Sequence, residues 1–155
     1  MNLRMMNPIV RWTLLMLFWV SAPLLAQNSN VERVGEYVIY YDVMPTPFLE
    51  PNIAQAYQIT RSRGLGLMRV SVVRERPDGQ REPVQARVSG HASTLAGQIS
   101  SLNFRNVQAG QEGYSAAVAS FRYQHDEPLR FDLTVHYANG QPAQRLQFLR
   151  RLLIE

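Results

Sequence analysis

Residues 129–137 alternate apolar and polar side chains without a break, and this alternation constrains the fold more than any other feature of the sequence. Leucine, phenylalanine, valine and tyrosine occupy the odd-numbered positions, while arginine, aspartate, threonine and histidine occupy the even-numbered ones. Successive side chains of a β-strand point to opposite faces of a sheet, so the segment predicts a strand with one buried and one solvated face. Such strands are typical of antiparallel sheets.

Other segments are rich in β-branched and aromatic residues and are bounded by turn residues, which also predicts strands. These strands are expected at residues 36–43, 67–76, 83–90, 98–107 and 114–123. Pro77-Asp78-Gly79 predicts a hairpin between the second and third of them, and residues 110–113 predict another turn. Residues 144–155 fit either a helix or a strand. We favour a strand paired with residues 129–137, because the hairpin signal Asn139-Gly140 calls for a partner.

Two further segments are not expected to form strands. Residues 27–34 are polar, and we expect a frayed chain end there. Pro51 suits the first turn of a short helix, which would place Ile53, Ala54 and Tyr57 on one face. Residues 61–66 are expected to form a loop.

About seven short strands, with turn signals about every 8–12 residues, predict an immunoglobulin-like antiparallel β-sandwich with one short helical turn. The Cys-Trp-Cys pattern of antibody domains is absent, because the chain has no cysteine and both tryptophans precede residue 27. A small β-barrel is the alternative architecture.

Residues 1–26 have the three parts of a secretory signal peptide. Arg4 and Arg11 precede or border an apolar run at residues 12–20, and Ala26 offers a small residue for cleavage. A membrane helix needs about 20 apolar residues, roughly twice this run, so an uncleaved anchor is the less favoured alternative. We expect residues 27–155 to form a single β-sandwich domain in a bacterial periplasm, with no stable membrane insertion once the leader is removed.

Composition excludes several classes of chemistry. All 16 basic residues are arginine, and the chain has neither lysine nor cysteine, which excludes disulfides, thiolate nucleophiles and Schiff-base chemistry. Loss of Arg4 and Arg11 with the leader leaves 14 arginines against 12 acidic residues, a net charge of +2. Basic and acidic residues alternate instead of clustering, so no nucleic-acid partner is expected.

Several segments together resemble a known family. They are Gly35-Glu-Tyr-Val-Ile-Tyr-Tyr, Phe48-Leu-Glu-Pro-Asn-Ile-Ala-Gln-Ala-Tyr, Arg61-Ser-Arg before Arg69-Val-Ser-Val-Val, Phe121-Arg122 and Glu127-Pro-Leu-Arg-Phe-Asp132. In them the sequence resembles a bacterial family of small exported proteins known only as domain of unknown function 4426. The resemblance covers nearly all of residues 27–155. It implies export and a β-rich fold, and it implies no activity, substrate or catalytic residue.

Arg61, Arg63 and Arg69, with Tyr57, are the candidate contact residues for a partner or an anion. A guanidinium group clamps carboxylate or phosphate with two parallel hydrogen bonds, and glycines in the same loop let backbone amides approach a ligand. The plainer interpretation is an exposed loop whose arginines pair with Glu50 or Asp42.

We predict no catalytic, cofactor or metal residues. The Gly-x-Ser-x-Gly motif of serine hydrolases is missing, and the segment around Ser89 and His91 lacks the strand–turn–helix context that this motif requires. His91, His125 and His136 lack metal-ligand spacing, so a zinc site at His125-Asp126-Glu127 is a minor hypothesis. Aromatic residues at positions 37, 40, 41, 48, 57 and 123 are expected to pack in the core and its rim, with a glycan or peptide pocket as the alternative.

Two functions remain. The favoured one is a non-enzymatic module of the bacterial envelope that binds a protein or peptide partner, through loop contact or strand addition at a sheet edge. The alternative is a hydrolase of a cell-wall glycan, which needs two carboxylates about 5–10 Å apart in a cleft. Its candidate acids are Glu36, Asp42, Glu50, Asp126 and Asp132.

Overall fold

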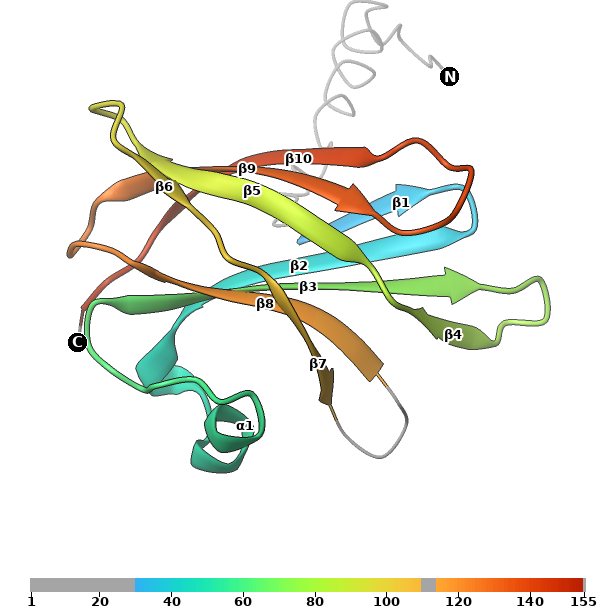
Figure 1. The fold of residues 1–155 in the computed structure, drawn as a ribbon, viewed down its shortest axis with the longest axis horizontal. Helices are drawn as coiled ribbons and strands as arrows, with labels where there is room; N and C mark the ends of the chain where they lie inside the picture. Colours follow the sequence, from blue (N-terminus) through green and yellow to red (C-terminus); the bar gives the residue numbers. More distant parts are fainter. Residues whose placement is uncertain (1–29, 110–113, 155) are drawn as a thin grey trace, which may run out of the picture.

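A computed structural model of the chain describes residues 30–109 and 114–154, which form two antiparallel sheets (Figure 1). The predicted leader and the predicted turn at residues 110–113 lie outside the described residues. The six-stranded sheet contains β1 (Val31–Val34), β2 (Tyr37–Pro45), β3 (Leu65–Glu75), β8 (Tyr114–Arg122) and β7 (Arg105–Ala109) in that order, and β4 (Arg81–Val84) pairs with β3. The four-stranded sheet contains β10 (Gln144–Arg151), β9 (Pro128–His136), β5 (Arg87–Thr94) and β6 (Ile99–Ser101).

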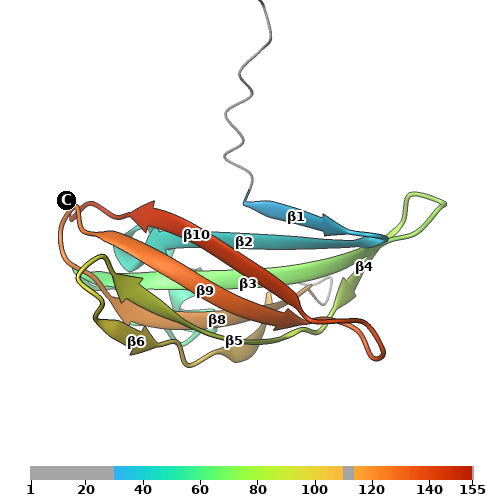
Figure 2. The same cartoon turned by 90° about the horizontal axis from the view of Figure 1, so that it is seen from above.

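The two sheets pack face to face as separate layers (Figure 2). This confirms the β-sandwich expected from the strand pattern, with ten strands among the described residues instead of about seven. The two separate sheets make the alternative of a small closed barrel wrong for this part of the chain. No helix in the described segments is long and apolar enough to cross a membrane.

The alternation along β9 decides which face is buried. Leu129, Phe131, Leu133 and Val135 are at most 4% exposed, and they enter the core between the sheets. Phe131 packs against Phe121 of β8 in the other sheet, with ring centroids 5.2 Å apart. The predicted buried face of this strand is therefore confirmed, and it faces the opposite sheet.

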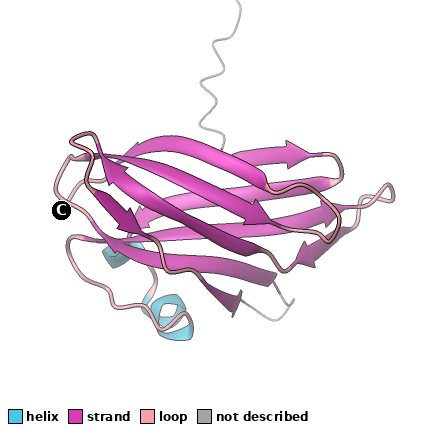
Figure 3. Cartoon of the chain, turned by 45° about the horizontal axis from the view of Figure 1, so that its top comes forward, coloured by secondary structure: helices cyan, strands magenta, loops and turns pink. Residues whose placement is uncertain are grey.

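A second, smaller core lies on the outer face of the six-stranded sheet. Helix α1 (Pro51–Ala56) begins at the predicted proline, and the helical segments lie outside the sandwich (Figure 3). Ala54 in the helix and Tyr57 directly after it are buried against that outer face. A 3-10 turn, η2 (Thr46–Phe48), precedes the helix. The buried Thr46 hydroxyl donates to the Ser62 carbonyl and accepts from the Ser62 amide, which holds both ends of the helical segment together.

Three predictions of strand boundaries were wrong. Residues 31–34 of the expected frayed end form β1, because their register against β2 places them in the six-stranded sheet. The expected strands 83–90 and 98–107 are each divided between the two sheets. In the first, β4 pairs with β3 while β5 pairs with β9; in the second, β6 pairs with β5 while β7 pairs with β8. Buried Ala86 and Leu102 lie at these crossings.

The C-terminal segment is a strand, as predicted. In β10, Leu146 lies opposite Leu133 and Phe148 lies opposite Phe131, so this strand extends the buried apolar face of β9. The connection between them is longer than the predicted two-residue turn, since β9 ends at His136 and β10 starts at Gln144. Between Arg76 and Gln80, by contrast, the predicted turn at Asp78-Gly79 closes the β3–β4 hairpin.

Replacement of Gly90 by alanine is expected to destabilise the sandwich. A Cβ at Gly90 would lie 2.2 Å from the Asp132 carbonyl oxygen, a backbone atom of the neighbouring β9 that cannot move away alone. We expect Gly90→Ala to lower the free energy of unfolding by about 2–3 kcal/mol, as overpacking does. Gly79→Ala is the matched control: its φ of +82° costs about 1 kcal/mol, but nothing lies within 4 Å of the new atom. Urea denaturation compares them, and equal losses would contradict the expectation.

Candidate functional site

A cleft of about 400 Å³ opens at the end of the sandwich where β3 begins and β8 ends. We call it the end cleft. Both sheets contribute to its lining, which consists of Arg63, Gly64, Ala92, Thr94, Gln98, Ser100, Arg122, Tyr123, Gln124, Glu127 and Leu129. Its volume lies within the range of about 300–1,000 Å³ that is usual for small-ligand sites.

The backbone before β3 holds Arg63 at this cleft. Gly64 has a φ of +75°, which favours glycine, and its carbonyl accepts a hydrogen bond of 3.0 Å from the Tyr123 amide. The Leu65 amide closes the turn by donating to the Ser62 carbonyl. Because the Ser62 backbone is itself bound to Thr46, the loop that carries Arg63 is anchored on both sides.

The two arginines of the end cleft have no acidic partner. Within residues 30–109 and 114–154, seven arginines form ion pairs: Arg33, Arg69, Arg74, Arg76, Arg81, Arg145 and Arg151. The guanidinium groups of Arg63 and Arg122 have no hydrogen bond or ion pair within the same residues, and only Arg87 and Arg130 share this condition. Glu127 is the one carboxylate among the residues that line the cleft. The charged side chains of the lining therefore leave an excess of one positive charge.

A smaller apolar hollow of about 150 Å³ adjoins the end cleft, because Arg63 and Tyr123 line both. We call it the apolar notch. Its other lining residues are Pro45, Pro47, Phe48, Leu153 and Ile154. Phe48 is 61% exposed and Leu153 is 51% exposed, so the notch presents large apolar side chains to solvent.

The chain end beside the notch is fixed by two hydrogen bonds. The Tyr123 hydroxyl donates to the Leu153 carbonyl, and the Ile154 amide donates to Nδ1 of His125. Burial raises the pKa of Tyr123, so this hydroxyl stays protonated and remains a donor. The notch is thus formed by segments that the fold holds in place.

Only one of the four predicted contact residues, Arg63, lines the end cleft. Arg61 donates to the Pro47 carbonyl at 2.7 Å. Tyr57 is 4% exposed beneath α1, and its carbonyl accepts a hydrogen bond from Arg105. Arg69 pairs with Asp42 at 3.7 Å, as the plainer interpretation expected for an arginine of this group. That pair lines a separate hollow on the outer face of the six-stranded sheet.

Sequence reasoning missed Arg122 as a site residue. It lies opposite Leu65 in the ladder between β3 and β8, and this register brings it to the same end of the sheet as Arg63. The two residues are far apart in the sequence, and their meeting depends on which strands pair. No local motif carries that information.

The aromatic residues mostly pack, as expected. Tyr37 contacts Tyr137 and Tyr41 contacts Phe148, with ring centroids 4.9 Å and 4.8 Å apart. Of the remaining predicted aromatics, Tyr57 and Tyr123 are buried, Tyr40 is half-buried and Phe48 is exposed. No single pocket gathers them among the described hollows.

Carboxylates do not gather in any described hollow. Four of the five acids considered for hydrolysis pair with arginine: Glu36 with Arg74, Asp42 with Arg69, Asp126 with Arg151 and Asp132 with Arg145. Each of the four described hollows has at most one carboxylate in its lining. A glycosidase needs one acid with a raised pKa, so this arrangement gives the hydrolase hypothesis no support.

The histidines are separated as well. In the described segments, no three side chains of histidine, aspartate or glutamate are placed to hold a metal ion. Nδ1 of His125 accepts the Ile154 amide, while His91 and His136 lie on the outer face of the four-stranded sheet. The minor hypothesis of a zinc site therefore has no geometric support.

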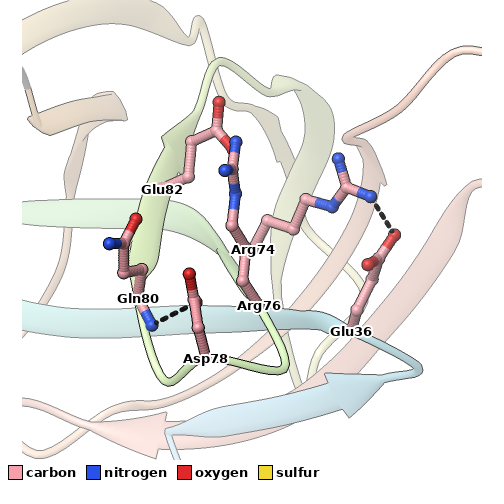
Figure 4. A network of polar contacts seen from close by, with 6 residues as sticks. All are labelled: Glu36, Arg74, Arg76, Asp78, Gln80 and Glu82. Atoms are coloured by element: carbon pink, nitrogen blue, oxygen red, sulfur yellow. Dashed lines mark hydrogen bonds and ion pairs between the residues drawn. The ribbon is translucent and has the colours of Figure 1, made fainter.

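The opposite end of β3 carries arginines that pair with carboxylates. Glu36 pairs with Arg74 at 3.0 Å, Arg76 pairs with Glu82 at 2.8 Å, and the Gln80 amide donates to Asp78 (Figure 4). Both arginines of this group have a carboxylate partner, in contrast to Arg63 and Arg122 at the end cleft.

The best-organised ion pair lies on the outer face of the four-stranded sheet. Arg145 donates two hydrogen bonds to Asp132, and Gln147 adds a third. The hydrogen bond from Arg145, with that from Gln147, lowers the pKa of Asp132 from 3.8 to about 2. A carboxyl group held ionised in this way serves structure and cannot act as a general acid near neutral pH.

Comparisons with known proteins agree with the resemblance seen in the sequence. A family model described as domain of unknown function (DUF4426) matches residues 31–155. A crystal structure of a DUF4426 family protein from Pseudomonas aeruginosa PAO1 is similar to the chain, with a TM-score of 0.68 and 32% sequence identity. The similarity covers 81% of this chain and 94% of that one. No match was found among curated proteins.

Loss of the Asp132 carboxylate is expected to destabilise the fold in a pH-dependent way. Because folding lowers the pKa of Asp132, its ionised carboxylate stabilises the fold fully above the ordinary pKa of 3.8. This stabilisation is lost as the pH falls toward about 2. We expect Asp132→Asn to cost about 1 kcal/mol at pH 7, and the difference from the wild type to shrink below pH 4. Denaturation at several pH values measures it. Asp126→Asn is the control, since the ion pair of Asp126 is exposed and the residue's φ of 57° suits asparagine. A loss of unfolding free energy in Asp132→Asn that does not vary with pH would contradict the expectation.

Proposed function

The chain belongs to the DUF4426 family, and we propose that it acts as an exported, non-enzymatic binding module that captures an anionic group in the end cleft. The observation that carries the proposal is the pairing state of the arginines. Seven arginines of the described residues are neutralised by carboxylates, but the two at the end cleft are not.

Unpaired guanidinium groups suit the capture of a carboxylate or phosphate. Each presents a planar fork that donates two parallel hydrogen bonds to an oxyanion, and the fork stays charged at any physiological pH. An arginine already paired with a carboxylate must lose that partner before it binds a ligand. Arg63 and Arg122 have no such partner in the described residues, so a ligand meets them without this cost.

Two further observations support a binding role over an enzymatic one. The acids named as candidates for hydrolysis are mostly committed to ion pairs, and Glu127 has no second carboxylate beside it in the end cleft. Export is supported by the tripartite pattern of residues 1–26. An anion-binding sandwich released on the far side of the inner membrane would meet envelope proteins and peptides.

Anion binding is expected to perturb the cleft arginines selectively. Titration of the purified protein with inorganic phosphate, and separately with succinate, should shift the Nε–Hε NMR signals of Arg63 and Arg122 with a Kd of about 1 mM or tighter. Arg63→Ala with Arg122→Ala should abolish the response of the remaining signals near the cleft. Arg87→Ala with Arg130→Ala is the matched control, because it removes two equally unpaired arginines elsewhere. Anion-induced shifts that survive the cleft variant, or that never occur, would refute the proposal.

Export predicts a defined product. Expressed with its leader in a bacterium, the protein should appear in the periplasmic extract, and its mass should correspond to a chain that begins at or next to Gln27. Recovery of the uncut chain in the membrane fraction, with Met1 retained, would contradict export as a free protein.

A further inference from the structure

The end cleft and the apolar notch of this protein adjoin each other. Arg63 and Tyr123 line both the end cleft and the apolar notch, so one arginine borders a polar chamber on one side and an apolar one on the other. A ligand that occupies both hollows reaches past the shared residues Arg63 and Tyr123, so a ligand whose anionic group and apolar group lie close together suits this arrangement. The ligand must also be small where it enters the notch, because that volume is about 150 Å³.

The C-terminal residue of a peptide has this arrangement. Its free carboxylate and its side chain are attached to the same Cα atom, whereas the carboxylate of an internal Asp or Glu stands at the end of its own side chain. We propose that the end cleft and the apolar notch together bind the free C-terminus of a peptide or protein whose last side chain is apolar. This inference rests on the proposed function, since it requires anion capture at Arg63 and Arg122.

The apolar notch has a composition suited to such a side chain. Phe48 and Leu153 are more than half exposed, and a terminal leucine would cover part of that surface. A fatty acid also combines a carboxylate with apolar groups. The volume of the notch, however, is about half of the 300 Å³ at which small-ligand sites usually begin, and this suits one side chain better than a long acyl chain.

The end cleft also offers groups for the peptide backbone. Gln98, Ser100 and Gln124 line it, and their side chains make no hydrogen bond within residues 30–109 and 114–154. Amide and hydroxyl groups can pair with the N–H and C=O groups of the residues before the terminus. Binding of this kind depends on the last side chain and on the free carboxylate, and it tolerates sequence variation in the preceding residues.

The test uses fluorescence anisotropy with three labelled hexapeptides that share five alanines. One ends in leucine with a free carboxylate, the second ends in leucine with an amide, and the third ends in serine with a free carboxylate. We expect the leucine acid to bind at least tenfold more tightly than either of the others. Arg63→Ala with Arg122→Ala should abolish the preference for acid over amide, while Arg87→Ala with Arg130→Ala should leave all three affinities unchanged.

A second variant tests the notch without disturbing the core. Phe48→Ser changes an exposed side chain. It should weaken binding of the peptide that ends in leucine with a free carboxylate about fivefold or more, and it should leave binding of the peptide that ends in serine unchanged. Equal binding of the leucine and serine acids, with the amide still weaker, would overturn this inference and leave anion capture intact. Equal binding of acid and amide would overturn both. Displacement of the leucine acid by dodecanoate at a lower concentration than by unlabelled peptide would assign the site to a fatty acid instead.

Discussion

The apolar layer between the two sheets is the constraint on which the rest of the structure depends. Phe131 of β9 has no exposed surface, and its ring lies 5.2 Å from both Phe121 and Phe148. Burial of each such ring contributes more free energy than any exposed ion pair. The layer also sets the position of the end cleft, because the core residues Leu129 and Tyr123 line it. The polar groups of the end cleft therefore stand on a packed base.

Local patterns were sufficient for the elements whose burial is periodic. The alternation in β9 and the proline at the start of α1 each predicted the observed element. The apolar positions of β10 fitted a helix as well as a strand, and the turn signal Asn139-Gly140 led to the correct prediction. Patterns were insufficient where one continuous β-rich segment serves two sheets. Residues 83–90 and 98–107 read as single strands, since each half has strand-like composition and the change of partner is decided by the opposite sheet.

The candidate site was harder to predict, for a geometric reason. Arg63 and Arg69 are close in the sequence, but Arg63 precedes β3, which begins at Leu65. A strand advances about 3.3 Å per residue, so Arg69 lies about 13 Å along the sheet from the start of β3. Arg122 reaches the end of β3 because it lies opposite Leu65. The sequence therefore indicated one residue of the cleft, Arg63. The second arginine required knowledge of the register between distant strands.

The order of the strands has a consequence for how this protein folds. The chain leaves the six-stranded sheet after β4, builds β5 and β6 in the other layer, and returns as β7 and β8. Strand β3 pairs with its sequence neighbours β2 and β4, but its pairing with β8 joins residues 45 to 57 positions apart. Domains dominated by such long-range pairings fold in milliseconds to seconds. Neither layer has anything to bury its apolar face until the other is present. The cleft at the end of the sandwich is therefore completed in the same cooperative step as the core.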